Sequence, residues 1–358
     1  MAKLTSPQVS VTFTELGISA ITRGDKGTVA LIVRDAAEVA PFAITQGTQT
    51  PDTLGKETQD YIKRTFLGYV NPPKKVIVYV LGEDGRLADA LDYMAAQVFD
   101  YICGPADCTN EEAADIAGWV KSQRQNSGAK FKAVLPNHKA DHYSIVNFTG
   151  DAMTDGSTVW ATAEYCSRIA GLLAGTPMKI AATYAPLPEL TDCARLTREE
   201  ADEAVGGGEL ALMWDGRKVK LNRAVTSLTT TSQGMLDSFK KIKIVEIMDL
   251  IRTDITSTAE DDYVGKFANS YDNKLLLITA IRGYFMELAR PTVNLVQPGY
   301  TVDIDVEAQE AYLMSRGANT EEMSEQQIRE ADTGSHVFIV IRCKILDAME
   351  DIIINVLI

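Results

Sequence analysis

Two of the chain's three histidines have the spacing of a metal-binding pair. His138 and His142 lie four residues apart in the stretch PNHKADHYS, and imidazoles at that spacing can bind zinc from one face of a helix. The pair follows an expected strand and Pro136, and no glutamate lies between the histidines as a zinc protease would require. A polar loop is the better interpretation, and no metal site is predicted.

A glycine-rich stretch, VGGGEL at 205–210, shares only its glycines with a phosphate-binding loop. No Lys-Ser/Thr pair follows them, and they end an expected helix, whereas a nucleotide site would place them before one. The stretch therefore predicts a turn.

The acidic stretch DIDVE at 303–307 would place three carboxylates on one face of a strand, where they could hold calcium. An EF-hand loop needs glycine at its sixth position, and Ala308 occupies that place. An exposed acidic strand face, opposite Val302, Ile304 and Val306, is expected instead.

Cysteine and serine chemistry has little support in the sequence. The five cysteines, at positions 103, 108, 166, 193 and 343, include no CxxC pair, so free thiols in a reducing cytoplasm are expected. No GxSxG stretch supplies a nucleophile elbow, although a triad whose members lie far apart in sequence stays open. We predict no catalytic, cofactor-binding or metal-binding residue. A cytosolic α/β enzyme with dispersed catalytic residues is the alternative.

Composition and length limit the class of protein. The 358 residues suffice for about two domains. A formal net charge of -14 argues against a nucleic-acid-binding surface and against binding to an anionic membrane, because both need excess Lys and Arg. No apolar run approaches the roughly 20 residues of a membrane span, and the start, MAKLTSPQVS, lacks the apolar core of a signal peptide.

Apolar runs alternate with helical patterns through about the first 235 residues. Four runs typical of strands covered on both faces are TVALIV from Thr28, KVIVYVL from Lys75, FDYIC from Phe99 and FKAVLP from Phe131. Between them apolar residues recur at helical spacing, and Thr109 with Glu112 has the spacing of a capping box, as does Thr197 with Glu200. This alternation predicts an α/β fold with a mostly parallel sheet flanked by helices.

The pattern changes after about residue 235. Two long helices are expected, over 234–255 and 273–291, followed by a strand over 300–307 and two short helices. Two apolar strands then close the chain, HVFIVIRCKIL and DIIINVLI. We therefore predict an α+β C-terminal domain.

Both ends of the chain carry strand patterns. Near the start, PQVSVTFTEL places Val9, Val11 and Phe13 on one face, and at the end DIIINVLI places Ile352, Ile354, Val356 and Ile358 on one face. A free apolar strand is an aggregation template unless another strand pairs with it. From the residues alone, the partner is either the chain's own sheet or that of a neighbour.

Seven stretches resemble the tail sheath protein of contractile phages and phage-tail-like bacteriocins, most closely the short sheaths of phages and diffocin-type particles of Gram-positive bacteria. The resemblance spans nearly the full length and is densest after residue 160. Its specificity comes from the number and order of the stretches, since none is a catalytic motif. They are PQVSVTFTEL, SRIAGLLAGTP (167–177), RAVTSLTT (223–230), FKKIKIVEIMDLIRTDI (239–255), DDYVGKFANSYDNKLLLITAI (261–281), VDIDVEAQEAYLMSRG (302–317) and ADTGSHVFIVIRCKILDAMEDI (331–352).

The resemblance implies a structural subunit and not an enzyme. Such proteins polymerise as stacked hexameric rings around a tail tube and contract to drive the tube through a target cell envelope, without nucleotide hydrolysis. The implied partners are other copies of the chain in a helical homo-polymer, the tail tube protein, and baseplate and tail terminator proteins. No cofactor, nucleic acid or membrane binding by the subunit is implied. The implied location is the bacterial host cytoplasm during assembly, then the virion tail or a released phage-tail-like particle.

The resemblance also implies that the terminal strands are donated between subunits and complete the sheet of the C-terminal domain. The donated residues would be Val9, Val11, Phe13, Ile352, Ile354 and Val356, and the acceptor strand would include Val337, Ile339 and Ile341. The implied organisation is an N-terminal strand arm (1–22), an α/β sheath domain (23–235), an α+β assembly domain (236–346) and a C-terminal strand arm (347–358).

The net charge raises the question of how copies pack together. We hypothesise that basic and acidic stretches form complementary pairs, with solvated faces as the alternative. The basic stretches are FKKIK (Lys240, Lys241, Lys243) and RKVK (Arg217, Lys218, Lys220), and the acidic one is REEADE (Glu199, Glu200, Asp202, Glu203).

Overall fold

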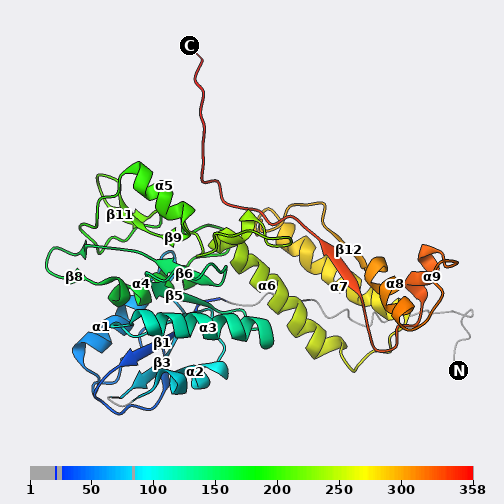
Figure 1. Ribbon diagram of the computed structural model, residues 1–358, viewed down its shortest axis with the longest axis horizontal. Helices are drawn as coiled ribbons and strands as arrows, with labels where there is room; N and C mark the ends of the chain where they lie inside the picture. Colours follow the sequence, from blue (N-terminus) through cyan, green and yellow to red (C-terminus); the bar gives the residue numbers. More distant parts are fainter. Residues whose placement is uncertain (1–20, 22–25, 83–84, 358) are drawn as a thin grey trace, which may run out of the picture. The chain divides into compact units, whose positions relative to one another are not determined.

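The computed structural model describes residues 21, 26–82 and 85–357, and Figure 1 labels their helices and strands. The chain divides into two compact units. The first, here called the α/β unit, comprises Gly24–Thr253 with Ile345–Ile358, and the second, the α+β unit, comprises Met1–Arg23 with Asp254–Lys344. The units separate inside helix α6 (Ile242–Thr258).

A seven-stranded sheet forms the centre of the α/β unit, in the order β2-β3-β1-β4-β5-β6-β9. Every neighbouring pair is parallel except β2 and β3, which are antiparallel at one edge. The mostly parallel sheet predicted from the alternating pattern is confirmed. The strands are β1 (Thr28–Arg34), β2 (Phe42–Thr45), β3 (Lys75–Leu81), β4 (Tyr101–Cys103), β5 (Lys132–Pro136), β6 (Ile145–Phe148) and β9 (Glu209–Leu210).

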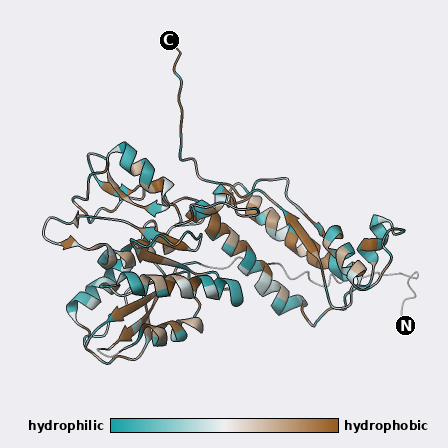
Figure 2. Cartoon of the chain, viewed as in Figure 1, coloured by the Kyte–Doolittle hydropathy of each residue, from teal (hydrophilic) through white to brown (hydrophobic). Residues whose placement is uncertain are grey.

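Side chains of β1 alternate between two apolar cores, one on each face of the sheet. Val29, Leu31 and Val33 pack into the core that contains helices α1 (Lys56–Thr65) and α4 (Thr162–Ala174). Ala30 and Ile32 pack into the core that contains α2 (Leu87–Ala95) and α3 (Asn110–Asn126). Burial on both faces explains why the run TVALIV of β1 has no polar alternation. Figure 2 shows the strands of the central sheet coloured as largely hydrophobic.

The capping signals at two helix starts are confirmed, and two short hairpins complete the α/β unit. Thr109 and Thr197 cap α3 and α5 (Arg198–Gly206) in reciprocal capping boxes with Glu112 and Glu200. The hairpin of β10 (Leu212–Trp214) and β11 (Val219–Leu221) turns at Asp215, whose carboxylate accepts the N–H groups of Arg217 and Lys218 at 3.0 Å each. A second short hairpin joins β7 (Met153–Thr154) to β8 (Val159–Trp160).

The α+β unit contains one long helix, α7 (Tyr271–Ala289), packed against strand β12 (Thr301–Ile304). Strand β12 pairs antiparallel with β13 (Ile339–Arg342) in a two-stranded sheet. Two short helices lie between these strands in sequence, α8 (Val306–Ser315) and α9 (Glu325–Glu330). A π-helical turn, Ala259–Tyr263, follows α6. Strand, helix, helix and strand thus follow in the predicted order.

One local prediction is wrong: DIDVE is not a strand face. Strand β12 ends at Ile304, and the Asp305 side chain accepts the N–H of Ala308 at 3.1 Å as the N-cap of α8. Glu307 lies in the first helical turn, where a carboxylate is favourable. The Asp303 carboxylate instead pairs with Arg329 at 2.7 Å. The three carboxylates therefore serve a helix start and an ion pair.

Candidate assembly surfaces

The end of the chain, residues 352–357, is here called the C-terminal arm (Figure 1). Its residues form no strand, although the sequence pattern predicts one. The predicted donor residues Ile352, Ile354 and Val356 are 73%, 78% and 76% exposed, and Ile353 and Leu357 on the opposite face are more exposed still. Both faces of this apolar segment therefore lie in solvent. The other predicted donor residues, Val9, Val11 and Phe13, lie outside the described residues.

The predicted acceptor residues lie on or beside β13. Ile339 and Ile341 are in the strand, opposite Ile304 and Val302 of β12, and Val337 precedes the strand and is 43% exposed. Val302 and Ile304 are buried, whereas Ile339 and Ile341 are half-buried on the same face. Within the described residues, β13 pairs with no strand other than β12. The apolar face of this sheet therefore continues to an edge at which the described residues form no third strand.

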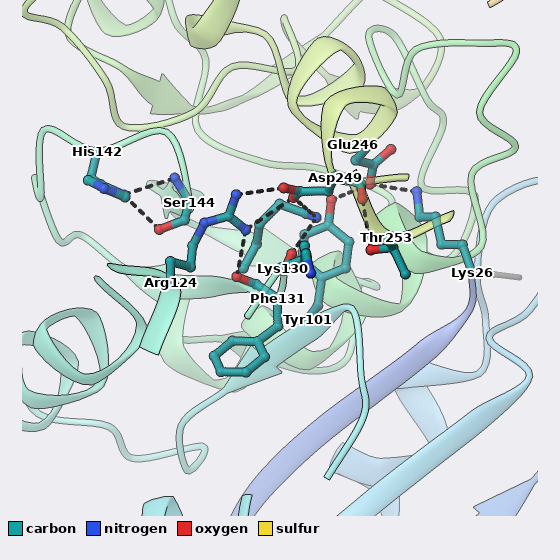
Figure 3. Close-up of polar contacts among 11 residues, drawn as sticks. Lys26, Tyr101, Arg124, Lys130, Phe131, His142, Ser144, Glu246, Asp249 and Thr253 are labelled. Atoms are coloured by element: carbon teal, nitrogen blue, oxygen red, sulfur yellow. Dashed lines mark hydrogen bonds and ion pairs between the residues drawn. The ribbon is translucent and has the colours of Figure 1, made fainter. Parts of the chain in front are cut away.

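A buried polar cluster holds α6 to the sheet of the α/β unit, as Figure 3 shows. Arg124 at the end of α3 forms two hydrogen bonds with the Asp249 carboxylate, at 2.6 and 3.1 Å, and Lys132 of β5 lies 3.1 Å from it. One turn earlier, Glu246 pairs with Lys26 at 2.5 Å and accepts the Tyr101 hydroxyl. The Glu246 and Asp249 carboxylates on one face of α6 thus bind side chains located at the amino ends of β1, β4 and β5.

Burial shifts the pKa values of the titratable groups in this cluster, and its position in the sheet indicates a structural role. Burial lowers the pKa of Lys26, and the Glu246 carboxylate opposes that shift. Burial likewise raises the pKa of the Tyr101 hydroxyl, reinforced by Glu246. In parallel α/β sheets, ligands bind at the carboxyl ends of the strands, opposite to the end where this cluster lies. The cluster therefore orients α6 and is poorly placed for catalysis.

The two histidines lie in the loop between β5 and β6, as predicted. His142 Nδ1 accepts the backbone N–H of Ser144 at 3.1 Å and lies 2.7 Å from its hydroxyl. Burial, together with the charges of Lys121 and Arg124, lowers the pKa of His142 to about 4. Within the described ranges, no group of three or more His, Cys, Asp or Glu side chains is arranged to hold a metal ion.

His142 makes the stability of the α/β unit depend on pH. In the unfolded chain its pKa returns to about 6.5, so the contribution of the neutral ring is fully present above that pH and lost as the pH falls towards 4. His142→Asn offers an oxygen that can accept the same N–H. We expect urea unfolding to show a shallower loss of stability between pH 7 and 4.5 in this variant. An identical loss in both proteins would contradict this role.

The remaining chemical candidates have structural roles. Gly208 follows α5 with a φ of +70°, and a side chain there would meet the Ser227 carbonyl at 2.8 Å, so the glycines form the predicted turn. All five cysteines are free thiols, and burial raises the pKa of Cys103, Cys108 and Cys166. A raised thiol pKa disfavours the reactive thiolate.

Several of the basic residues proposed for charge pairing have partners within the chain. Lys241 pairs with Asp347 and Glu350, while Lys220 pairs with Asp215 at 3.2 Å. Lys240 pairs with Asp237 at 2.9 Å. The acidic partners Asp347 and Glu350 could not be predicted from the sequence, because they lie more than 100 positions from Lys241.

Comparison with known proteins places this chain among sheath proteins. Two family models match in order: the phage tail sheath protein central domain over residues 83–227 and the phage tail sheath C-terminal domain over residues 237–358. The tail sheath protein of Clostridium phage phiCD119 is 37% identical over 353 residues, covering 97% of this chain and 98% of the relative.

Solved structures show the same fold at low sequence identity. The sheath tail protein of Desulfitobacterium hafniense matches with a TM-score of 0.69 at 17% identity. The match covers 83% of this chain and 94% of the Desulfitobacterium chain. The helical sheath of the anti-feeding prophage in its contracted state has a TM-score of 0.67 at 13% identity and covers 99% of each chain. The family predicted from the resemblance is confirmed, and its members are structural proteins rather than enzymes. The chain belongs to the phage tail sheath protein family.

Proposed function

We propose that this sheath subunit polymerises as stacked hexameric rings around a tail tube, and that contraction of the polymer drives the tube through a target cell envelope. The observation that carries the assembly proposal is the exposed C-terminal arm. A contiguous apolar segment in solvent marks an interaction site. Support for a contractile polymer comes from the fold shared with the anti-feeding prophage sheath in its contracted state.

The C-terminal arm is proposed to pair, in a neighbouring subunit, with the edge of β13 at which the described residues form no third strand. Strand addition satisfies the unpaired backbone groups of an edge and selects side chains by alternation. With Ile352, Ile354 and Val356 on the inward face, the arm would extend the apolar surface that Val302 and Ile304 begin and that Ile339 and Ile341 leave half-buried. Val9, Val11 and Phe13 are proposed as a second donated strand.

The free energy gained by burying one arm, compared with the cost of association, favours a cooperative polymer over a stable pair of subunits. Burying three aliphatic side chains contributes about 5–9 kcal/mol, at about 1.5–3 kcal/mol each. Association costs about 4–15 kcal/mol in lost translational and rotational freedom. One arm therefore barely offsets the cost of association, and a lattice in which each subunit both donates and accepts strands is needed for stable assembly.

The further partners follow from this role. We propose contacts with the tail tube protein and with baseplate and tail terminator proteins, assembly in the bacterial host cytoplasm, and then a place in a virion tail or a released phage-tail-like particle. The proposed organisation remains an α/β sheath domain (23–235) and an α+β assembly domain (236–346) between two strand arms. Contraction would then be a rigid-body rearrangement of folded subunits.

Negative-stain electron microscopy of the purified protein tests the proposal. We expect hollow cylinders or rings that become longer or more numerous as the protein concentration rises, because each subunit must find partners for its arms. Uniform small particles at high concentration would contradict assembly by this chain alone.

A further inference from the structure

The five residues before the C-terminal arm, 347–351, are held to the α/β unit by a compact set of polar contacts. The central member is Glu350, whose side chain is only 6% exposed. Its carboxylate accepts the hydroxyl of Thr183 at 2.5 Å and the ammonium of Lys241 at 3.0 Å, and Arg223 lies 3.9 Å away. A carboxylate is this well buried only where several donors satisfy it.

Two flanking carboxylates extend the contact along the chain. Asp347 also pairs with Lys241, and Asp351 pairs with Arg223 at 2.5 Å. Burial lowers the pKa of Lys241, but the two carboxylates more than offset this and the net pKa is raised. The hydrogen bond that Arg223 donates to the Asp351 carboxylate raises the pKa of Arg223. Both cations are thus stabilised by residues from the far end of the chain.

The three segments that carry the donors of this contact are joined to one another by hydrogen bonds that do not involve the acidic segment. Thr183 Oγ1 accepts the N–H of Ala224 at 3.1 Å, and the next residue, Val225, forms a β-bridge with Lys241. The N–H of Ile242 then bonds to the Ala224 carbonyl at 3.2 Å. Hydrogen bonds of the backbone and of the Thr183 hydroxyl therefore hold three segments, around 183, 223 and 241, together. Donors held in place in this way lose less entropy when they bind residues 347–351.

Asp351 is the last residue with a polar contact to this site. The Glu350 side chain is 6% exposed, although its neighbour Met349 is 93% exposed. Asp351 is exposed but paired, and from Ile352 onward every described residue is exposed. The apolar alternation begins directly after this last contact.

We infer that Thr183, Arg223 and Lys241 form an anchor for residues 347–351 that positions the C-terminal arm for donation to a neighbouring subunit. This inference rests on the proposed strand donation. When residues 347–351 are bound to the anchor, only the arm is free to move, and at about 3.3 Å per residue it reaches about 20 Å. When residues 347–351 are released, the free segment is several residues longer. The effective concentration of the arm at one acceptor edge then falls. The anchor residues act through the arm and touch no neighbour in this role.

Proteolysis of the unassembled subunit tests the anchor directly. A glutamate-specific protease that cleaves after Glu350 would remove residues 351–358, and intact-mass spectrometry would quantify that product. We expect cleavage at least tenfold faster in Arg223→Ala/Lys241→Ala than in the unmodified chain. The matched control is Lys240→Ala, whose lysine pairs with Asp237 and not with the arm segment. Equal cleavage rates in the double variant and the unmodified chain would overturn the anchor.

A second double variant guards against misfolding as the cause of faster cleavage. Asp347→Asn/Asp351→Asn changes only two exposed or partly exposed side chains and is expected to accelerate cleavage in the same direction. Both anchor variants should also raise the protein concentration needed for cylinder formation, measured by sedimentation, while Lys240→Ala leaves it unchanged. Because cleavage is scored before assembly, a failure of the unmodified chain to form cylinders would count against the proposed function alone. Faster cleavage with unaltered cylinder formation would overturn the positioning role.

Discussion

Removal of residues 352–358 is expected to abolish cylinder formation while leaving the subunit folded. The described residues of this segment form no strand and are exposed, so their loss should change the free energy of unfolding by no more than about 0.5 kcal/mol, as for other exposed positions. The cut falls after Asp351, which keeps its ion pair with Arg223. Calorimetry would report the unchanged fold, and electron microscopy the loss of cylinders.

Single substitutions test whether the arm acts as a strand with one inward face. Ile354→Asn replaces a proposed inward side chain, and the loss of about 1.5–3 kcal/mol of burial corresponds to a tenfold to hundredfold higher assembly concentration. Asn355→Ser, on the opposite face, is the matched control and should assemble normally. Normal cylinders from the truncated chain would refute the arm as the link between subunits.

Much of the α/β unit could be predicted because its signals are local. The run from Thr28 has no polar alternation, since both faces of β1 are covered, and Thr109 and Thr197 mark helix starts within four residues of their partners. Strand β6 was not predicted. Its four residues include the buried Asn147, and the loop that joins it to β5 contains no helix to signal a crossover.

The long-range polar contacts could not be predicted, since no local pattern specifies a partner more than 100 residues away. Lys241 and Glu350 are one example, and Arg124 and Asp249 are another. A weak signal for the second did exist. Glu246 and Asp249 lie three residues apart on α6, amid apolar residues on most sides, so two carboxylates must share a buried face. The DIDVE error has a different, local origin, because Asp305 is as suitable for a helix cap as for a strand end.

Replacement of Asp249 by alanine is expected to have the largest effect on stability of any single substitution in the α/β unit. The carboxylate is paired with Arg124 and Lys132, whose side chains are 6% and 5% exposed, and its loss leaves two buried cations without their partner. Breaking a buried ion pair by removing one member costs about 3–5 kcal/mol, a large fraction of the about 5–15 kcal/mol that stabilises a typical domain. Urea unfolding would measure the loss.

Two comparisons separate the lost charge from the lost side chain. Asp249→Asn keeps an oxygen that can accept from Arg124 and should therefore destabilise less than alanine. Asp237→Ala removes the partner of Lys240 in an exposed pair and should cost no more than about 1 kcal/mol. Equal losses for the buried and exposed alanine variants would contradict the cluster's role. Because assembly requires folded subunits, a strongly destabilised Asp249 variant should fail to assemble even with its C-terminal arm intact.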